Sequence, residues 1–371
     1  MFFQYIFSAY LVIGIYTYFR INNLLISKGK KILFTILFIF LVAGFPMVEQ
    51  LAHYESTLNL VPLIKMGFYT LPFLLYLFLL VLVFDIFLLI NLILKLMPKG
   101  FLKSYNFRKW GLISTIGIPG LILIYGIINF NFIRISEYNV EIPRRSSKLN
   151  HLNVAFVTDF HIGDLTSLEF VEQFVRKLNL LNVDIILFGG DLLEGDRDDL
   201  RMSHIETLFQ QVDAKYGKYG VFGNHERHSR KSSHDFYRSA GIVTLQDSAV
   251  CIDSSFYLVG RQEARDDDRL SIFELTENLS NDFSVFMLDH RPTDLKASSK
   301  SRVDIQFSGH THHGQLFPFN LITSYIYEIS WGHGIIENTH FFVSSGIQLW
   351  GSPVRTIGKS EIMMVNVHFT D

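Results

Sequence analysis

Residues 152–161 read LNVAFVTDFH, a short apolar run that ends in Asp159 and His161. A run of this length, rich in valine and phenylalanine, is typical of a buried β-strand. The arrangement returns at four later predicted strands, which also end in side chains of the types that bind metals. These endings are Asp191 after residues 184–188, Asn224 and His225 after 220–222, His290 after 284–288, and His310 and His312 after 303–307.

Segments with helical spacing separate the predicted strands. Residues 167–182 place their apolar side chains on one face, as a helix packed on a sheet does, and a second helix is expected at 200–212. Three further strands are expected at 256–259, 341–344 and 361–367. This alternation predicts a layered α/β domain over residues 151–371.

The first 134 residues have a different pattern, with four apolar stretches that are near or above the roughly 20 residues a helix needs to span a bilayer. They cover residues 2–19, 32–48, 67–94 and 110–133. We therefore predict an all-α transmembrane bundle of four helices at residues 1–134 and a polar connector at 135–150. The start of the chain lacks the basic residues of a secretory signal, so we expect the first stretch to be retained.

The positions of the basic residues predict the orientation of this bundle, because short loops rich in lysine and arginine stay cytoplasmic. The loops after the first and third stretches hold nine such residues, whereas the intervening loop holds only Lys65. This difference predicts an extracytoplasmic α/β domain on a protein of the inner or plasma membrane. Arg134, Arg144, Arg145 and Lys148 favour the opposite orientation.

The composition narrows the classes of partner. Up to Arg145 the chain has 13 Lys and Arg against 5 Asp and Glu, and the remainder has 20 against 30. Because the larger part is acidic, we expect no nucleic-acid partner. The single cysteine, Cys251, excludes an internal disulfide framework and a cysteine-based zinc site. Asp85 lies inside the third apolar stretch, where it either pairs with a neighbouring helix, is protonated, or marks a functional site.

The five strand endings together indicate a metal site. Carboxylate, imidazole and amide ligands suit divalent ions such as Mn, Fe or Zn, and the lack of thiolate disfavours a structural zinc site. The number of such residues suggests two ions, which need one bridging carboxylate and serve to activate water and clamp the oxygens at phosphorus. Glycines precede Asp191, Asn224 and His310, where they let the backbone approach the ions.

In this order the motifs resemble those of the calcineurin-like metallophosphoesterases, and within them the membrane-attached bacterial phosphodiesterase subgroup. The motifs are TDFHIGD at residues 158–164, GGDLLEGD at 189–196, VFGNHE at 221–226, LDHRP at 288–292, SGHTHHGQLFP at 308–318 and FVSSGIQLWGSPVR at 342–355. The resemblance extends from residue 150 to the C-terminus. It implies two stacked mixed β-sheets flanked by helices.

The resemblance also implies the roles of individual residues. Asp159, His161, Asp191 and His312 would hold the first of two divalent metal ions, and Asp191, Asn224, His290 and His310 the second, with manganese preferred. Asp191 would bridge the two ions. His225 matches the family's non-ligand histidine, which contacts the phosphate and can protonate the leaving group.

Three positions depart from the usual pattern of the family. His313 stands where the family usually has glycine, and we favour an exposed bystander over a phosphate contact. Glu226 stands in place of a common aspartate, and Asp289 in place of a common small polar residue. We expect neither of these two changes to touch a predicted ligand.

The sequence therefore predicts a membrane-anchored, dinuclear metal-dependent phosphoesterase in which a metal-bridging hydroxide attacks phosphorus. We expect a diester substrate because of the resemblance, and a membrane-borne one, such as a phospholipid or lipid-linked saccharide, because of the tether. One alternative is a catalytically idle metal-binding sensor or scaffold. Others are a bundle that serves transport or partner binding and, in the opposite orientation, a cytoplasmic pyrophosphatase of a nucleotide-linked lipid. Protein partners and oligomeric state are not predicted.

Residues 317–331 are unusually apolar for a loop that follows a metal site. Aromatic residues favour the headgroup level of a bilayer, where an apolar body and a polar tip are both satisfied. One hypothesis is that this segment touches lipid or holds an acyl chain. The other is that it packs on its own sheet.

Overall fold

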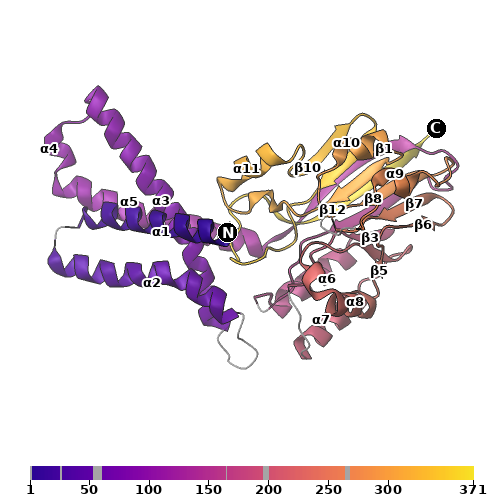
Figure 1. Cartoon of the computed structure of the whole chain (residues 1–371), viewed down its shortest axis with the longest axis horizontal. Coiled ribbons are helices and arrows are strands. Elements are labelled where there is room, and N and C mark those ends of the chain that lie inside the picture. The colour runs from indigo at the N-terminus through magenta and orange to yellow at the C-terminus, as the bar shows by residue number, and fades with distance from the viewer. Residues whose placement is uncertain (1, 26, 53–60, 164, 195–199, 264–267) are drawn as a thin grey trace. The chain divides into compact units, whose positions relative to one another are not determined.

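Figure 1 shows the computed structural model of the chain, which describes residues 2–25, 27–52, 61–163, 165–194, 200–263 and 268–371. The chain divides into two compact units, which we call the helical unit and the sheet unit. The helical unit comprises Met1–Ile128 and Gly351–Thr356, and the sheet unit comprises Asn129–Trp350 and Ile357–Asp371. Asp164 and Asp196, which end two of the sequence motifs, lie outside the described residues.

Long helices build most of the helical unit. They are α1 (Phe2–Asn22), α2 (Lys28–Ala52), α3 (Val61–Leu94) and α5 (Tyr105–Asn131), with the short α4 (Lys99–Leu102) before α5. Among the described residues, three segments are long and apolar enough to cross a membrane, namely Lys28–Val48, Val61–Leu94 and Tyr105–Asn131. A helix suits hydrocarbon because it satisfies its own backbone hydrogen bonds where no water can.

The prediction of four spanning helices was wrong by one. The first apolar stretch does form a helix, α1, but this helix mixes apolar residues with Tyr10, Tyr16, Thr17 and Tyr18 and has Arg20 in its last turn. The described part of α1 is not among the three spanning candidates.

Asp85 of α3 pairs with α1. Its carboxylate accepts hydrogen bonds from the guanidinium of Arg20 and from the hydroxyl of Tyr16, both on α1. An ionised side chain in a membrane-spanning helix is costly unless a partner of opposite charge lies beside it. Of the readings left open by the sequence, the structure therefore puts Asp85 in an ion pair with a neighbouring helix.

Residues 351–356 belong to the helical unit although they lie near the end of the sequence. The hydroxyl of Ser352 donates to the carbonyl of Phe68 in α3 (2.7 Å), and the amide of Arg355 donates to the carbonyl of Gly126 in α5 (3.0 Å). Gly126 permits this approach, because a Cβ there would lie 2.5 Å from a side-chain carbon of the segment. The segment thus packs with two of the membrane-spanning helices.

Two six-stranded mixed sheets form the sheet unit, as predicted. In spatial order the first contains β1 (Ile133–Pro143), β12 (Ser360–Thr370), β2 (His151–Val157), β3 (Ile185–Phe188), β4 (Lys218–Gly220) and β5 (Val243–Thr244). The second contains β10 (Gly332–Ile336), β11 (Thr339–Val343), β9 (Ile305–Ser308), β8 (Ser284–Leu288), β7 (Phe256–Gly260) and β6 (Ser248–Ile252). The strands that the metal-site residues follow, β2 to β4 and β8 to β9, are parallel neighbours within their sheets.

Apolar side chains of both sheets form a common core between them. Phe156 of β2 contacts Phe307 of β9, with ring centroids 5.2 Å apart, and Phe307 stacks on Phe342 of β11 at 5.4 Å. All three rings are fully buried. Burial of apolar surface contributes roughly 25 cal/mol per Å² to folding, so this core holds β2 of one sheet against β9 of the other.

Helices flank the sheets (Figure 1). They are α6 (Leu168–Asn179), α7 (Leu200–Gln210) and α8 (Arg230–Ser239) beside the first sheet, and α9 (Ile272–Thr276) and α10 (Leu295–Lys300) beside the second. The helix α6 begins at Ser167, whose side chain accepts a hydrogen bond from the amide of Phe170. Such a cap satisfies a backbone donor that the first helical turn leaves open.

The eight strands and two helices predicted for the second half are present, with ends within three residues of the predicted ones. The structure differs from the predicted boundaries in two places. Residues 351–356 join the helical unit, and most of the predicted connector belongs to β1, which pairs in parallel with β12. The strand β1 lies at the sheet edge and carries Glu137, Asn139 and Glu141, so its apolar signal is weak.

Candidate metal centre

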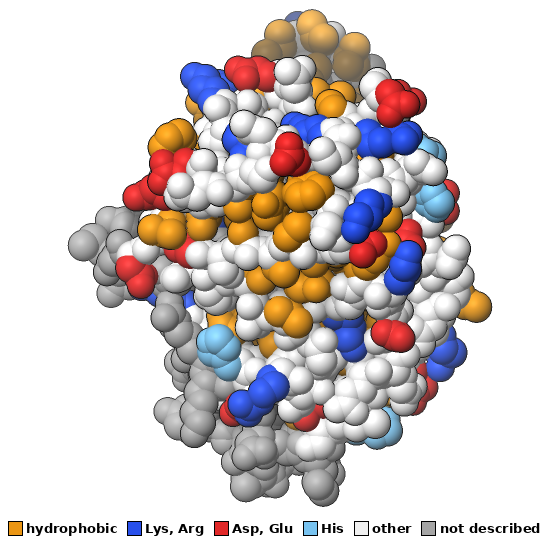
Figure 2. All heavy atoms as spheres, turned by 90° about the vertical axis from the view of Figure 1, so that its right-hand side faces the viewer, with side chains coloured by type: hydrophobic (Ala, Val, Ile, Leu, Met, Phe, Trp, Pro, Cys, Tyr) orange, Lys and Arg blue, Asp and Glu red, His pale blue; other side chains and the backbone are white. Residues whose placement is uncertain are grey.

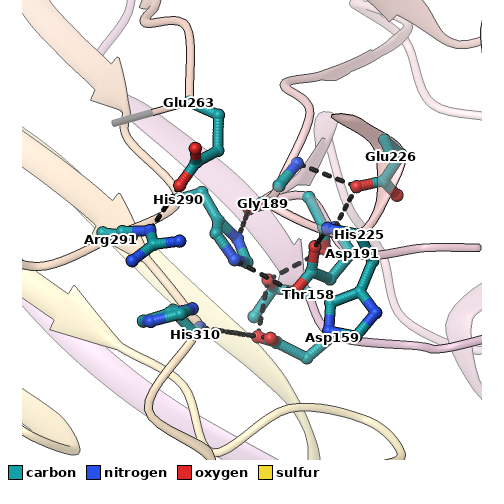
Figure 3. Close-up of polar contacts among 12 residues, drawn as sticks. Thr158, Asp159, Gly189, Asp191, His225, Glu226, Glu263, His290, Arg291 and His310 are labelled. Carbon is teal, nitrogen blue, oxygen red and sulfur yellow. Dashed lines mark hydrogen bonds and ion pairs between the residues drawn. The ribbon is translucent and has the colours of Figure 1, made fainter. Parts of the chain in front are cut away.

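The carboxyl ends of strands from both sheets meet at one site. Asp159 and His161 follow β2, Asp191 follows β3, Asn224 and His225 follow β4, His290 follows β8, and His310 and His312 follow β9. Figure 3 shows His290 and His310 approaching from one side and Asp191 and His225 from the other, with the carboxylate of Asp159 near His310. The fold therefore collects side chains that lie far apart in the sequence.

Three overlapping groups of side chains are close enough to share a cation. They are Asp159, His161 and His312; His161, Asp191 and His225; and Asp191, His290 and His310. Within each group the potential ligand atoms all lie within 4.8 Å of one another. The groups contain seven of the eight residues predicted for the site, and Asn224 is the eighth.

All three residues of the first group are buried. Nε2 of His312 lies 3.5 Å from Oδ1 of Asp159, and Nε2 of His161 lies 3.9 Å from the same oxygen. The two Nε2 atoms are 3.3 Å apart. Metal–ligand bonds of about 2.0–2.2 Å separate two ligands on one ion by roughly 3–3.5 Å, so this spacing suits a cation.

The second and third groups share Asp191. Nε2 of His290 lies 3.1 Å from Oδ2 of Asp191, and Nε2 of His161 lies 4.0 Å from the same oxygen. The other ring nitrogen of His290, Nδ1, is 2.8 Å from the carbonyl oxygen of Gly189, a contact that fixes the ring. One carboxylate oxygen thus faces both groups, which is the position of a bridging ligand.

Asn224 adds an amide oxygen beside these groups. The next residue, His225, donates its backbone amide to Oδ1 of Asp191 at 2.8 Å. Oδ1 of Asn224 is buried and has no hydrogen-bond partner in the described part of the chain. A buried polar atom without a partner costs about 1–3 kcal/mol, and a bound cation would offset that cost. The residues present therefore fit a divalent metal site.

The backbone is strained at five of the seven predicted ligands. Each has a positive φ, namely Asp159 (53°), His161 (48°), Asp191 (51°), His310 (68°) and His312 (47°). Residues other than glycine rarely adopt this conformation, which costs of order 1–3 kcal/mol and persists where the surrounding structure enforces it. Strain of this kind gathers at functional sites.

Two glycines allow carboxylates to enter the site. A Cβ at Gly223 would lie 2.2 Å from Oδ1 of Asp191, and a Cβ at Gly309 would lie 2.2 Å from Oδ2 of Asp159. Any side chain at these positions would displace a predicted ligand. The glycines before Asn224 and His310 thus leave room for the carboxylates of Asp191 and Asp159.

Glu194, which the sequence analysis did not single out, contacts two histidines of the site. Its Oε2 lies 2.8 Å from Nδ1 of His161, and its Oε1 lies 3.0 Å from Nδ1 of His225. Burial would raise the pKa of Glu194, but the hydrogen bonds from both histidines outweigh burial and lower the pKa to about 2. A carboxylate on Nδ1 orients each ring and leaves Nε2 for the centre of the site.

Glu226 holds the backbone around Asp191. Its buried carboxylate accepts hydrogen bonds from the amides of Asp191 (2.9 Å), Gly223 (2.8 Å) and Leu193 (3.2 Å). Burial, reinforced by the charge of Asp191, raises the pKa of Glu226 to about 7. The expectation that Glu226 touches no predicted ligand was wrong, because it binds the amide of Asp191.

Arginine–carboxylate pairs border the site. Asp289 pairs with Arg261 (3.1 Å) and with Arg269, and Arg291 pairs with Glu263. Figure 3 places Arg291 and Glu263 on the side of the site from which His290 and His310 approach. These pairs neutralise buried carboxylates and bring a guanidinium next to the predicted ligands.

Charges inside the site shift the pKa values of three histidines. Burial would lower the pKa of His290, but the carboxylate of Asp191 outweighs it and raises the pKa to about 10. Burial would also lower the pKa of His225, but the hydrogen bond to Glu194 and the charge of Asp191 raise it to about 9. Burial and the charge of His290 lower the pKa of His310 to about 2. Asp191 thus favours the protonated forms of His290 and His225, whereas the surroundings of His310 favour its neutral form.

His313 follows His312 directly but does not belong to the clustered groups. None of the three groups, which were formed from the described residues, contains it. Its ring packs against Trp331, with centroids 4.9 Å apart, and Trp331 in turn donates from Nε1 to the buried carboxylate of Glu361 at 2.8 Å. Trp331, at the end of the apolar segment 317–331, thus contacts β12 of the first sheet, although it directly precedes β10 of the second.

Residues 152–314 match the sequence model of the calcineurin-like phosphoesterase family. The match starts in β2 and ends after His312, so it contains all eight predicted site residues. This stretch is therefore similar to the calcineurin-like phosphoesterase domains. The family binds divalent metals, and the three side-chain groups of this stretch are its candidate ligand clusters.

Curated relatives also have phosphoesterase names. An uncharacterized metallophosphoesterase of Helicobacter pylori strain J99 is 28% identical over 240 residues, which are 60% of this chain and 61% of the relative. One of Campylobacter jejuni is 28% identical over 302 residues, 75% of each chain. A zebrafish "transmembrane protein with metallophosphoesterase domain" is 24% identical over 286 residues, 70% of this chain and 62% of the relative. The alignments thus span about three fifths of the length of two of these three relatives.

Proposed function

We propose that the protein is a membrane-anchored phosphoester hydrolase whose site binds two divalent cations. The observation that carries the proposal is the position of Asp191, whose Oδ2 faces His290 at 3.1 Å and His161 at 4.0 Å. A carboxylate shared between two ligand groups is what a dinuclear site requires. The family match supplies the class of reaction.

We assign the ligands as the resemblance implies. Asp159, His161, Asp191 and His312 bind the first ion, and Asp191, Asn224, His290 and His310 bind the second. The donor set of carboxylate, imidazole and amide suits manganese, iron or zinc, of which we favour manganese. Bound ions of this class polarise phosphoryl oxygens and lower the pKa of the attacking water.

His225 completes the site as its acid. Its Nδ1 is held by Glu194, and its backbone amide is held by Asp191, so the ring keeps one orientation. The raised pKa of His225, about 9, keeps it protonated at neutral pH. We assign Nε2 of His225 to contact the phosphate and to protonate the oxygen that leaves.

A membrane-borne phosphoester is the substrate class that best suits the tether. The spanning helix α5 ends at Asn131, and strand β1 of the sheet unit begins at Ile133, so one residue separates them. The substrate would then be a phospholipid or a lipid-linked saccharide, cleaved as a diester. We propose an extracytoplasmic catalytic domain on the inner or plasma membrane, from the distribution of basic residues in the loops.

The test uses the full chain, purified, loaded with Mn²⁺ and reconstituted in vesicles. Its substrates are a phospholipid, a lipid-linked saccharide, a nucleotide-diphosphate lipid, and a chromogenic diester and monoester. We expect hydrolysis that a chelator abolishes. His225→Ala should lower kcat by roughly 10²–10⁴-fold, the usual contribution of a general acid, with unchanged metal content. His368→Gln, at an exposed position on β12, is the matched control.

The rival functions make different predictions in the same experiment. A metal-binding sensor would cleave none of the esters, and its biological role would survive His225→Ala. A cytoplasmic pyrophosphatase would prefer the nucleotide-diphosphate lipid, and a protease added outside sealed cells would leave the C-terminus intact. Cleavage of the C-terminus by that protease would support the extracytoplasmic orientation.

A further inference from the structure

The helix α11 (Phe319–Ile326) exposes an apolar surface beside the metal centre. None of its eight residues, all of which are described, is buried, and its sequence FNLITSYI has no charged side chain. Tyr325 is 91% exposed. We define the α11 patch as the exposed apolar residues Phe317, Phe319, Leu321, Ile322, Tyr325 and Ile326.

Both ends of α11 join the loops of the metal centre. Gly314, two residues after His312, packs so closely on the start of the helix that a Cβ there would lie 2.4 Å from the amide nitrogen of Asn320. At the other end, the ring of Tyr327 lies edge-on to the ring of His310, with centroids 6.3 Å apart. The α11 patch is therefore anchored next to two predicted ligands.

The chain also connects the α11 patch to the helical unit. Gln315, four residues before α11, accepts a hydrogen bond from the amide of Ile357 (3.3 Å). Ile357 is covalently joined to Thr356, the last residue of the segment 351–356 in the helical unit. The hydroxyl of Thr356 is hydrogen-bonded to the hydroxyl of Tyr76 in the spanning helix α3. Ile357, which is hydrogen-bonded to Gln315, and Thr356, which is hydrogen-bonded to α3, are thus joined by one peptide bond.

We propose that the α11 patch lies in the headgroup–acyl boundary of the lipid bilayer that the helical unit spans. An uncharged helix with exposed aromatic residues, which none of the described elements buries, suits this boundary, because its apolar side chains enter the acyl region and its tyrosine stays at headgroup level. On the face shown in Figure 2, by contrast, acidic and basic side chains are scattered among the hydrophobic ones.

This inference deepens the proposed function, on whose membrane-borne substrate it partly rests. A helix that lies in the boundary and is anchored to the loops of His310 and His312 keeps these loops at the level of lipid phosphates. A lipid substrate then reaches the metal centre by moving within the plane of the membrane.

The closing experiment measures depth in the bilayer and needs no catalysis. In a Cys251→Ser background, which removes the only cysteine, Tyr325→Cys is labelled with a fluorophore in the full chain reconstituted in phospholipid vesicles. The matched control is Leu180→Cys, a site 84% exposed at the end of α6. We expect nitroxide-labelled lipids to quench the label at position 325 at least about two-fold more strongly than the label at 180.

Three results would overturn the proposal. The first is equal quenching of the two labels by the lipids. The second is quenching of position 325 by aqueous iodide as strong as that of position 180. The third is protection from both quenchers together with cross-linking between the 325 positions of two chains, because a second copy would then cover the α11 patch. Ile322→Cys, on the same exposed surface, repeats the measurement should the label at 325 disturb the helix.

An activity measurement separates this inference from the proposed function. The triple variant Leu321→Asn, Tyr325→Asn, Ile326→Asn should lower kcat/KM about tenfold on a phospholipid in vesicles but leave a soluble chromogenic diester unaffected. The control replaces Leu180 and Phe273, which are exposed in other elements, by Asn. Equal losses on both substrates would count against the α11 patch. If the unmodified protein cleaves none of the esters in the substrate panel, the proposed function fails and the quenching still decides the position of α11.

Discussion

The helical unit and the sheet unit each contain a cluster of charged side chains, and the two clusters balance their charges differently. In the helical unit, one carboxylate, Asp85, is paired with one guanidinium, Arg20, and the hydroxyl of Tyr16 completes the set. In the metal centre, the carboxylates of Asp159 and Asp191 lie among histidines, and a buried amide oxygen of Asn224 has no partner among the described residues.

This difference separates a structural cluster from one that requires a ligand. Asp85 needs no cation beyond its own arginine, so the pair serves to join α1 to α3. In the metal centre, several oxygen and nitrogen acceptors face a common point. The backbone at Asp159 and Asp191 adopts positive φ angles, in the left-handed region of φ and ψ. The contrast predicts that changes in the metal centre reduce activity, whereas changes in the Asp85 pair reduce stability.

The largest expected effect comes from Asp191→Asn. An amide cannot supply a full negative charge to two cations, so we expect kcat/KM to fall by at least about 10³-fold, equivalent to about 4 kcal/mol of transition-state stabilisation. Bound metal, measured by mass spectrometry of the purified protein, should fall as well. Asp282→Asn, at an exposed position before β8, should change neither quantity. Full metal content with full activity in the Asp191 variant would remove the basis of the contrast.

A smaller effect is expected from Glu194→Gln, which sharpens the contrast because Glu194 orients two histidines without belonging to the predicted ligands. Loss of an orienting partner typically costs about 10–100-fold in activity. Glu194 also raises the pKa of His225 to about 9, so its replacement should lower that pKa towards the ordinary value of about 6.5. His225 would then lose its proton at a lower pH. The alkaline limb of the pH–activity profile should therefore shift to lower pH.

The control for Glu194→Gln is Glu172→Gln. Glu172 pairs with Arg176 on the surface of α6 and is 42% exposed in its side chain. Glu172→Gln should leave both the activity and the alkaline limb of the pH–activity profile unchanged. An unshifted alkaline limb in the Glu194 variant would mean that His225 is not the acid in the reaction.

The smallest effect is expected from Asp85→Asn, the corresponding change in the helical unit. Polar contacts between membrane helices contribute about 0.6–1.7 kcal/mol to stability. The free energy of unfolding, measured by thermal unfolding in detergent, should therefore fall by about that amount. Activity per folded molecule on a soluble ester should not change. The double variant Arg20→Met, Asp85→Met should recover part of the stability, because it leaves no unpaired charge. A selective loss of activity in Asp85→Asn would show that this cluster too is functional.

Much of the metal centre could be predicted because its residues lie just after the ends of predicted strands. Asp159, Asp191 and His290 lie two or three residues after the ends of apolar strands, and parallel strands have their carboxyl ends at one edge of a sheet. Glu194 and Glu226 could not be found in this way. Their partners come from other strand ends or are backbone amides, and no local spacing in the sequence reports either kind of contact.

The membrane-spanning part shows the same limit. The lengths of the apolar stretches predicted the spanning segments α2, α3 and α5. Length is enough here because a helix makes its backbone hydrogen bonds within its own segment and needs no partner from elsewhere in the chain. It overcounted by including α1, and it could not name the partner of Asp85, because pairing depends on how two helices pack. The return of residues 351–356 to the helical unit depends likewise on contacts with residues such as Phe68 and Gly126.

The sequence by itself determined the resemblance to the phosphoesterase family, the order of the strands that carry the metal-site residues, and the presence of long apolar helices. Each of these follows from residue types and from the spacing of apolar residues over a few neighbouring positions. Only the tertiary structure decided that Asp191 faces two groups, that Glu194 orients two histidines, and that α11 stays exposed beside the metal centre. These features arise when the two sheets pack on each other, since only then do side chains distant in sequence come within a few ångströms.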